Sequence, residues 1–486
     1  MKATLTYITI VCLAFLSTAQ NSDFITTWQT TANNETITIP TFADETYNYT
    51  VDWGDGTTNS NLTAEASHTY TSAGTYDISI TGLFPQIYFQ AATQDNRDKI
   101  IDVKQWGNNS WGSMLYAFFN CSNIEVSATD APDLTNVTNL YGMFRGATTF
   151  NQPINHWDVS NVTEMSEMFS SSSTFNQPLD NWDISNLQDM RAMFFGASSF
   201  NQPLDNWDVS NVHDLRGMFF GASSFNQPLN NWNVSNVQYI SSMFDGASAF
   251  NQPLDSWDVS GVVSLAFLFR NARAFNQPLD SWDVNNIEYM NSMFDGASTF
   301  NQPLNSWDVG NVRFMTEMFD GATAFNQPLN NWNISSVTQM DNMLRRSYLS
   351  IENYDTTLQG WATLTNLQNN VTLGANNLNY CNGEAPRNLL INNFGWTIID
   401  AGLDCSNLSI NDESLRFATL YPNPATDYIS ISNSNTQDNY TIYNILGKKV
   451  NSDLLLPESK ISVTHLEKGI YFLKLGNLKA LRFVKN

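Results

Sequence analysis

The stretch FNQPLDNWDVSNVHDLRGMFFGASS, residues 200–224, decides the fold because it recurs along the middle of the chain. Equivalent tryptophans stand 25 residues apart, and equivalent phenylalanines keep the same step, without an insertion across eight units. A fixed period of this length is typical of repeat proteins, in which each unit buries its apolar face against its neighbours. The tryptophans are Trp157, Trp182, Trp207, Trp232, Trp257, Trp282, Trp307 and Trp332.

The apolar residues inside one unit predict a short helix after a short strand. Between residues 212 and 222 they recur at intervals of three and four, which is typical of one helical face. Asn211 and Asp214 form a capping-box pattern at the start, and Gly221 supplies a left-handed C-cap. Residues 204–209 predict a short extended segment. Stacked units of this kind predict a β/α solenoid of 25-residue leucine-rich-type repeats with a parallel sheet.

At 486 residues, the chain is long enough for several domains. Alternating apolar runs around glycine turns predict a small β-sandwich on each side of the repeats. The predicted segments are a signal peptide over 1–19, a β-sandwich over 20–90, an N-terminal cap over 91–133, the solenoid over 134–345, a C-terminal cap over 346–408 and a second sandwich over 415–486.

The N-terminus predicts export. Lys2 is followed by an apolar run over residues 7–16 and by the small residues Ser17 and Ala19, which is typical of a cleaved secretory signal peptide. No later segment approaches about 20 uninterrupted apolar residues, so we expect no transmembrane segment. Exported proteins can keep disulfides, and Cys381 with Cys405 is the candidate pair. Cys121 is expected to be a small buried thiol, although its role stays open.

The charge balance excludes nucleic acid as a partner. The chain has 22 Lys and Arg against 46 Asp and Glu, a net charge of −24. Lysine is absent between Lys104 and Lys448, so the middle of the chain cannot form a polybasic patch.

The repeat GASSFNQPLDNWDVSNVxxMxxMF, over about residues 134–344, resembles the unit of BspA-type leucine-rich-repeat surface proteins of bacteria. This resemblance implies a β/α solenoid and adhesion to host proteins, matrix proteins or other cells. The segment LQGWATL from Leu358 and the stretch around Cys381 look like the cap that closes such repeats. DWGDGT at residues 52–57, with HTYTSAGTYDISI at 68–80, is similar to polycystic-kidney-disease (PKD) domains, which are immunoglobulin-like modules.

The tail resembles the type A sorting domain of type IX secretion substrates in Bacteroidetes. Three motifs occur in order: YPNPATDYISI from Tyr421, IYNILGKKV from Ile442 and LEKGIYFLKL from Leu466, before a basic RFVK ending. The resemblance implies the type IX machinery as a partner and a secreted or cell-surface location across the outer membrane. It also implies that the sorting-signal residues are Pro422, Asn423, Pro424, Gly447, Gly469, Tyr471 and Lys485.

The sequence predicts no enzyme. Its four histidines are scattered, and it has no phosphate-cradling glycine loop, HExxH motif or paired CxxC motif, so we expect no catalytic residue, cofactor or metal site. One alternative stays open, because aspartates equivalent to Asp208 share one register and could bind Ca²⁺. The other reading, which we favour, is that each aspartate caps its own turn.

The sequence favours a secreted surface protein that mediates adhesion or protein–protein binding. Its ligand would be an extracellular protein, a cell surface or a glycan. Four residues occupy equivalent positions of different repeats but differ in type, and they are the candidate partner-facing residues: His213, Gln238, Glu288 and Arg313. The alternatives are a structural stalk or matrix component, and a glycan-binding accessory protein. The last would need exposed tryptophans, whereas the strict register of Trp207 favours a core position.

Overall fold

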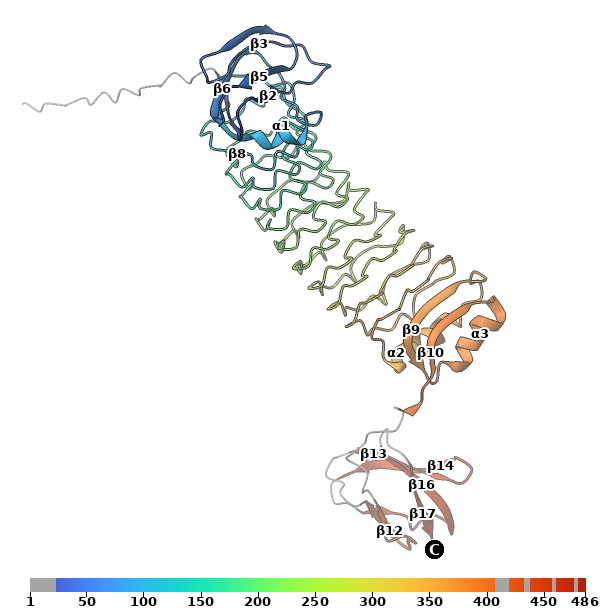
Figure 1. Ribbon diagram of the computed structural model, residues 1–486. Helices are drawn as coiled ribbons and strands as arrows, with labels where there is room; N and C mark the ends of the chain where they lie inside the picture. Colours follow the sequence, from blue (N-terminus) through green and yellow to red (C-terminus); the bar gives the residue numbers. More distant parts are fainter. Residues whose placement is uncertain (1–22, 407–418, 432–437, 457–459, 476–479) are drawn as a thin grey trace, which may run out of the picture. The chain divides into compact units, whose positions relative to one another are not determined.

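The computed structural model describes residues 23–406, 419–431, 438–456, 460–475 and 480–486 (Figure 1). The chain divides into two compact units, Met1–Asp404 and Cys405–Asn486. The predicted signal peptide lies outside the described residues. No helix among the described residues is both long enough and apolar enough to cross a bilayer.

The first unit begins with two small sheets. One has six strands in the order β4-β3-β6-β1-β7-β8, and the other pairs β2 with β5. Trp28, Tyr49 and Ile78 are fully or almost fully buried between them, in a core that continues into the repeats. The strands are β1 (Phe24–Thr30), β2 (Glu35–Ile39), β3 (Asn48–Asp52), β4 (Thr58–Leu62), β5 (Ala66–Tyr70), β6 (Gly74–Leu83), β7 (Ile100–Gln105) and β8 (Glu125–Val126).

The sheets pass directly into the repeats. Helix α1 (Gln94–Lys99) begins at Thr93, whose side chain accepts a hydrogen bond from the backbone N–H of Asn96. Strand β7, which follows it, pairs antiparallel with β1 and parallel with β8. The segment predicted as a cap thus supplies the two last strands of the first sheet. The parallel direction of that last pair is also the direction in which the repeats stack.

The prediction of a β/α solenoid between immunoglobulin-like sandwiches is wrong. Among the described residues between β8 and α2 (Ile351–Trp361) there is neither a helix nor a named strand. The units are instead successions of turns joined by isolated parallel bridges, such as Asp189 with Asp214. These bridges fall inside the predicted helix, and residues 204–209 form no strand. Outside the repeats the described residues form small sheets and few helices.

The backbone hydrogen bonds explain the error. The N–H groups of Leu215 and Gly221 donate to the carbonyl oxygens of Tyr239 and Asp245 in the next unit, at 2.8 and 2.7 Å. The N–H of Met218 closes a tight turn onto Leu215 at 3.2 Å. A helix would need such groups to bond four residues back in the same unit. Successive turns of about three residues therefore reproduce the apolar spacing of a helix without forming one.

Backbone dihedral angles make a helix impossible in this segment. Gly217, in the middle of the segment, has φ of +59°, and a right-handed helix cannot contain such a residue. Gly221 has the left-handed φ of +66° that was expected of it, but it follows a turn and not a helix. The expected caps act differently as well. The side-chain amide of Asn211 donates to the carbonyl oxygen of Ser185 in the previous unit at 2.8 Å. Asp214 accepts from the backbone N–H of Arg216 at 2.9 Å.

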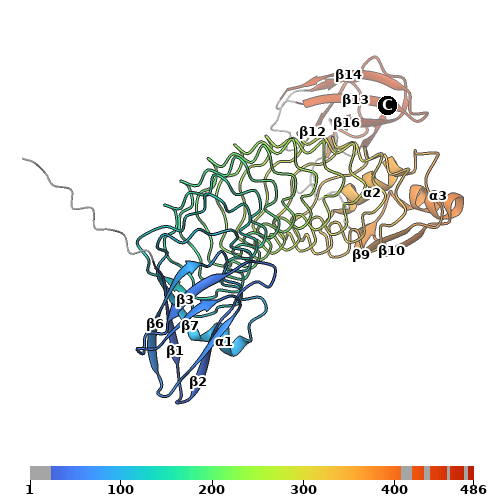
Figure 2. The same ribbon diagram turned by 90° about the horizontal axis from the view of Figure 1, so that it is seen from above.

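The units lie one after another in a stack, here called the repeat stack (Figures 1 and 2). Columns of identical side chains hold them in register. The rings of Phe194 and Phe219, one unit apart, stack with centroids 5.7 Å apart. The indole N–H of Trp207 donates to the carbonyl oxygen of Leu179 at 3.1 Å. Asparagines at another register form a ladder in which each side-chain oxygen accepts the next unit's backbone N–H. The units from Trp182 to Trp332 repeat the same tryptophan contact, whereas the indole N–H of Trp157 in the first repeat has no partner among the described residues.

A cap of two helices and two strands closes the first unit. Its parallel strands are β9 (Thr372–Tyr380) and β10 (Thr397–Leu403), with α3 (Glu384–Phe394) between them. The cap copies the contacts of a repeat. The indole N–H of Trp361 donates to the carbonyl oxygen of Leu329 at 3.0 Å, and Asn353 donates to Asn326. The bridge between Met340 and Leu373 joins β9 to the last repeat.

The three described cysteines fall into two classes. Cys381 and Cys405 are both disulfide-bonded. Cys121 is free and fully buried, and this burial raises the pKa of its thiol well above the ordinary value. A buried thiol that resists ionisation is chemically inert.

The second unit contains two small sheets around one core. The sheet orders are β11-β12-β15 and β14-β13-β16-β17. Ile429, Ile442, Leu473 and Phe483 are fully buried between them. The strands are β11 (Leu420–Tyr421), β12 (Tyr428–Ile431), β13 (Asp438–Asn444), β14 (Lys449–Leu455), β15 (Ile461–Ser462), β16 (Gly469–Leu475) and β17 (Leu481–Lys485).

Candidate interaction surface

One edge of the repeat stack carries side chains that differ from unit to unit. The parallel bridges place equivalent residues side by side there, and His213 N–H donates to the carbonyl oxygen of Gln188 at 3.0 Å. We call this edge the variable strip. It consists of the residue pairs 163–164, 188–189, 213–214, 238–239, 263–264, 288–289 and 313–314, and it includes all four predicted partner-facing residues.

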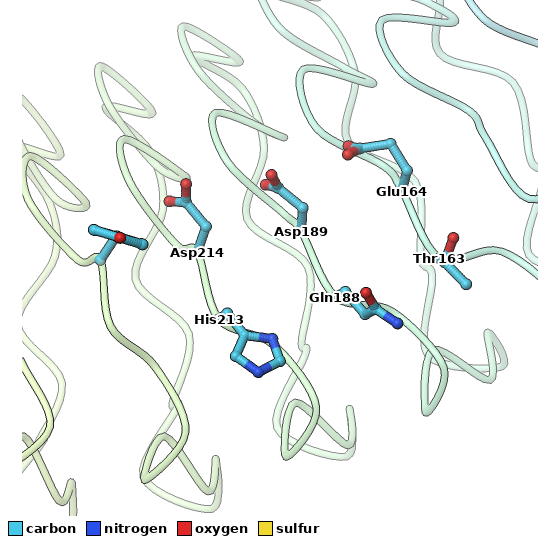
Figure 3. A pocket seen from close by; sticks show the side chains of 7 residues that line it. Thr163, Glu164, Gln188, Asp189, His213 and Asp214 are labelled. Carbon is cyan, nitrogen blue, oxygen red and sulfur yellow. The ribbon is translucent and has the colours of Figure 1, made fainter.

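The first part of the variable strip is hollowed into a groove of about 420 Å³. Figure 3 shows the carboxylates of Glu164, Asp189 and Asp214 in a row along successive units, with Gln188 and His213 beside them. Thr163 and Tyr239 complete the lining. The groove is therefore polar, and three neighbouring units contribute one carboxylate each.

Hydrogen bonds orient these carboxylates differently. Asp189 accepts from the hydroxyl of Ser166 at 2.6 Å and from the N–H of Arg191 at 2.8 Å. Asp214 is nearly buried and binds the guanidinium of Arg216, whose Nε lies 2.9 Å from its Oδ2. Burial raises the pKa of the Glu164 carboxyl above its ordinary value, and hydrogen bonds from Ser166 oppose this shift.

The second part of the variable strip is aromatic and exposed. Tyr239, Val263 and Tyr289 keep 46%, 51% and 39% of their surface accessible. The rings of Tyr289 and Phe314 stack nearly parallel, with centroids 4.9 Å apart. The Arg313 guanidinium lies 5.5 Å from the Phe314 ring centroid. Exposed apolar and aromatic side chains grouped on one edge mark a candidate interaction site.

The four predicted partner-facing residues lie on this edge but do not act alike. His213 and Gln238 are exposed. Arg313 and Glu288 form an ion pair with each other at 3.1 Å. The prediction missed the adjacent register, which holds Asp189 and Tyr289 among others. That register varies from unit to unit just as strongly, and this signal would have identified it.

The structure gives the tryptophans and the aspartate column structural roles. Trp207 and its equivalents are 1–4% exposed, which is incompatible with a flat sugar-binding platform. Asp208 accepts the backbone N–H of Ser210 at 3.0 Å, and the Ser210 hydroxyl and N–H lower the pKa of that carboxyl. Asn233 makes the same contact in its own unit. Within the described ranges, no group of three or more His, Cys, Asp or Glu residues could hold a metal ion.

A separate row of charged residues makes the repeat stack sensitive to pH. Asp245 binds Arg270, and Asp320 binds both Arg345 and Arg346. Asp295 lies between these groups in the same register. Burial, together with the negative charges of Asp320 and Glu317, raises the pKa of its carboxyl to about 6. Ionised Asp295 therefore destabilises the fold.

The substitution Asp295→Asn is expected to stabilise the protein at pH 7 but not at pH 4. The raised pKa means that the native state binds the proton more tightly than the unfolded state, so stability falls as pH rises from about 4 to 6. The gain is about 1 kcal/mol after allowance for solvent screening. Urea denaturation at both pH values measures it. The control Asp258→Asn should give no gain at pH 7, because Ser260 lowers the pKa of that carboxyl. An equal gain from Asp295→Asn at pH 4 would contradict the prediction.

The predicted sorting-signal residues lie in the second unit, where folding brings distant motifs together. Asn423, between Pro422 and Pro424, accepts the N–H of Val484 at 2.9 Å. Gly469 pairs with Lys485, and the ring of Tyr471 stacks on Phe483. Gly447 has φ of +75° in the turn between β13 and β14, which favours glycine.

The repeats and the tail match two known families. Three overlapping segments, 112–219, 179–274 and 252–361, match the family described as "Mycoplasma protein of unknown function, DUF285", and together they cover just over half of the chain. The chain is thus a repeat protein and belongs to this family. Residues 419–485 match the family described as "Secretion system C-terminal sorting domain". No curated protein and no solved structure matches the chain.

The sorting domain supports export by the type IX secretion system, which delivers its substrates to the cell surface or beyond it. The secretion machinery is therefore one partner of the chain. The family of the repeats carries no assigned activity in its description.

Proposed function

We propose that the chain is a BspA-type surface protein, with a PKD-like N-terminal region, that adheres to an extracellular protein or a cell surface through the variable strip. The observation that carries this proposal is the group of exposed side chains of Tyr239, Val263 and Tyr289 on that edge. The residues that recur from unit to unit are explained by folding, because the Phe, Trp and Asn columns make contacts within the repeat stack. Exposed Tyr289 and half-buried Phe314 are not part of the buried core.

Binding rather than catalysis is the activity that the described residues support. His68 bonds Asp55 at 2.8 Å and stacks on Trp53, which gives it a structural role. His213 lies beside carboxylates and an amide rather than a nucleophile. We propose accordingly that the protein is not an enzyme and needs no cofactor, and that its source is a bacterium of the Bacteroidetes type.

Binding of the purified mature chain to matrix proteins, glycans and whole cells tests the proposed function. Saturable binding to a protein or a cell surface is expected, and a Tyr289→Ser/Phe314→Ser variant should lose most of it. Binding to glycans alone would favour the glycan-binding accessory protein. Binding to none of these would favour a structural stalk and contradict the proposal.

Removal of residues 419–485 is expected to block export. The chain should then accumulate inside the cell, and its extracellular amount should fall more than tenfold, because the signal read by the secretion machinery is gone. Immunoblots of culture medium, cell surface and periplasm measure this. Deletion of one complete repeat, residues 201–225, is the control, since it leaves the tail intact. Normal export of the truncated chain would contradict the prediction.

A further inference from the structure

We propose that the variable strip binds one extended polypeptide segment of a partner protein. This segment carries Lys or Arg side chains over the groove and apolar side chains over the aromatic part. The inference rests on the proposed binding function and adds the chemistry of the partner. It is carried by the exposed side chains of Tyr239, Val263 and Tyr289, by the groove at the other end of the variable strip and by the charges of both parts.

The stacked rings favour a polypeptide over a sugar. Tyr289 and Phe314 lie 4.9 Å apart with an angle of 10° between their planes, so each covers a face of the other. One face of each ring is therefore unavailable to a sugar. Tyr, Phe and Arg side chains grouped together on a surface are typical of the centres of protein–protein interfaces.

The groove selects a cationic end of the segment. Glu164 and Asp189 form no ion pair among the described residues, whereas Asp214 is neutralised by Arg216. Arg191 lowers the pKa of Glu164 through its charge, so these five side chains together retain one net negative charge. The chain as a whole has a net charge of −24, which attracts cationic partners over a longer range.

The aromatic part selects an apolar end. The pairs 238–239 and 263–264 contain no charged residue. Glu288 and Arg313 neutralise each other at 3.1 Å. Exposed Tyr239, Val263 and Tyr289 can therefore bury apolar side chains of a partner without leaving an unpaired charge.

The dimensions of the variable strip fit a segment of defined length. Its seven residue pairs are separated by six steps of about 4.8 Å, or roughly 29 Å in total. An extended polypeptide rises about 3.3 Å per residue, so about nine residues span this distance. Parallel bridges join the units from Glu164 to Tyr239 and again from Ser264 to Phe314, and the constant 25-residue step keeps the two parts in one register.

The chain itself offers matched variants for the test. Glu164→Gln/Asp189→Asn removes two charges from the groove, and Asn139 already occupies the same register, where it accepts a backbone N–H as Asp189 does. Asp208→Asn/Asp258→Asn removes the same charge from a different register, in which Asn233 makes the equivalent contact. Thermal denaturation of each variant verifies that it is folded.

The experiment measures the binding of labelled ten-residue peptides to the full mature chain. One peptide has four lysines followed by leucines and phenylalanines, a second has the same residues in alternation, and a third has glutamates in place of lysines. The first should bind at least tenfold more tightly than the others. Its Kd should rise about tenfold in the Glu164→Gln/Asp189→Asn and Tyr289→Ser/Phe314→Ser variants, and the charge effect should shrink at high salt.

Three outcomes would overturn the inference: no binding of the first peptide, equal binding of all three peptides, or an equal loss in the Asp208→Asn/Asp258→Asn control. If the proposed function itself is wrong, the mature chain will bind neither matrix proteins nor whole cells, which is a different result. If the chain binds them and the variable-strip variants bind them unchanged, adhesion stands and the assignment of this surface fails.

Discussion

Trp232→Ala is expected to lower the free energy of unfolding by about 3–5 kcal/mol, the usual cost of removing a buried tryptophan. The side chain is 3% exposed, and its indole N–H donates to the carbonyl oxygen of Leu204 at 2.8 Å. Its ring also stacks on Trp257 of the next unit. The substitution leaves a cavity and removes a hydrogen bond between two units, while the Leu204 carbonyl keeps its bond from the backbone N–H of Trp207 at 3.1 Å. Two neighbouring units therefore lose support.

Urea denaturation followed by circular dichroism measures this loss. Trp232→Phe keeps most of the apolar volume and loses only the hydrogen bond, so it should cost about 1–2 kcal/mol. Gln238→Ala, in the same unit but exposed, should change stability by less than about 0.5 kcal/mol. A Trp232→Ala variant as stable as the Gln238→Ala variant would show that the tryptophan column does not stabilise the repeat stack.

Gly374→Ala is expected to detach the C-terminal cap from the last repeat. A Cβ atom at this position would lie 2.3 Å from the backbone nitrogen of Asn342 and 2.5 Å from its Cα. Gly374 also accepts the N–H of Leu344 at 2.8 Å through its carbonyl. Because the clash is with backbone, no side-chain rotation can relieve it, and a loss of about 2–3 kcal/mol follows.

Limited proteolysis measures detachment of the cap, since cleavage around β9 should become at least tenfold faster. Gly261→Ala is the matched control, because its Cβ would make only ordinary contacts at 3.6 Å and the equivalent residue in the other units is asparagine or serine. Equal protease resistance of Gly374→Ala and the wild type would contradict the close contact between cap and repeats.

The register of the repeats could be read from the chain because identical residues recur at a constant step. Trp207 and Phe200 were predicted to form core columns, and both are buried in the structure. Asn201 and its equivalents recur at the same step, and their side chains form a hydrogen-bonded ladder between units. The tail was likewise predicted from its motifs, and the family match confirms a sorting domain.

The local structure of a unit could not be predicted, because turns and a helix give the same apolar spacing. The choice depends on where each N–H group finds its acceptor. The N–H of Leu215 donates to the carbonyl oxygen of Tyr239 in the following unit, and this acceptor is in place only after the units have stacked. For the same reason the variable strip was only half predicted. His213 was identified, whereas Tyr289 was missed because a helix would have turned the adjacent register toward another side.

The amino-acid sequence by itself determined which residues are buried in each unit and the register between units. It also determined that the tail is a sorting domain. These properties depend on side-chain chemistry repeated at fixed spacing. Only the tertiary structure decided that the units consist of turns and that carboxylates and aromatic rings of separate units line one edge. Both depend on hydrogen bonds between units, and a single unit has no partner for those bonds until its neighbour is in place.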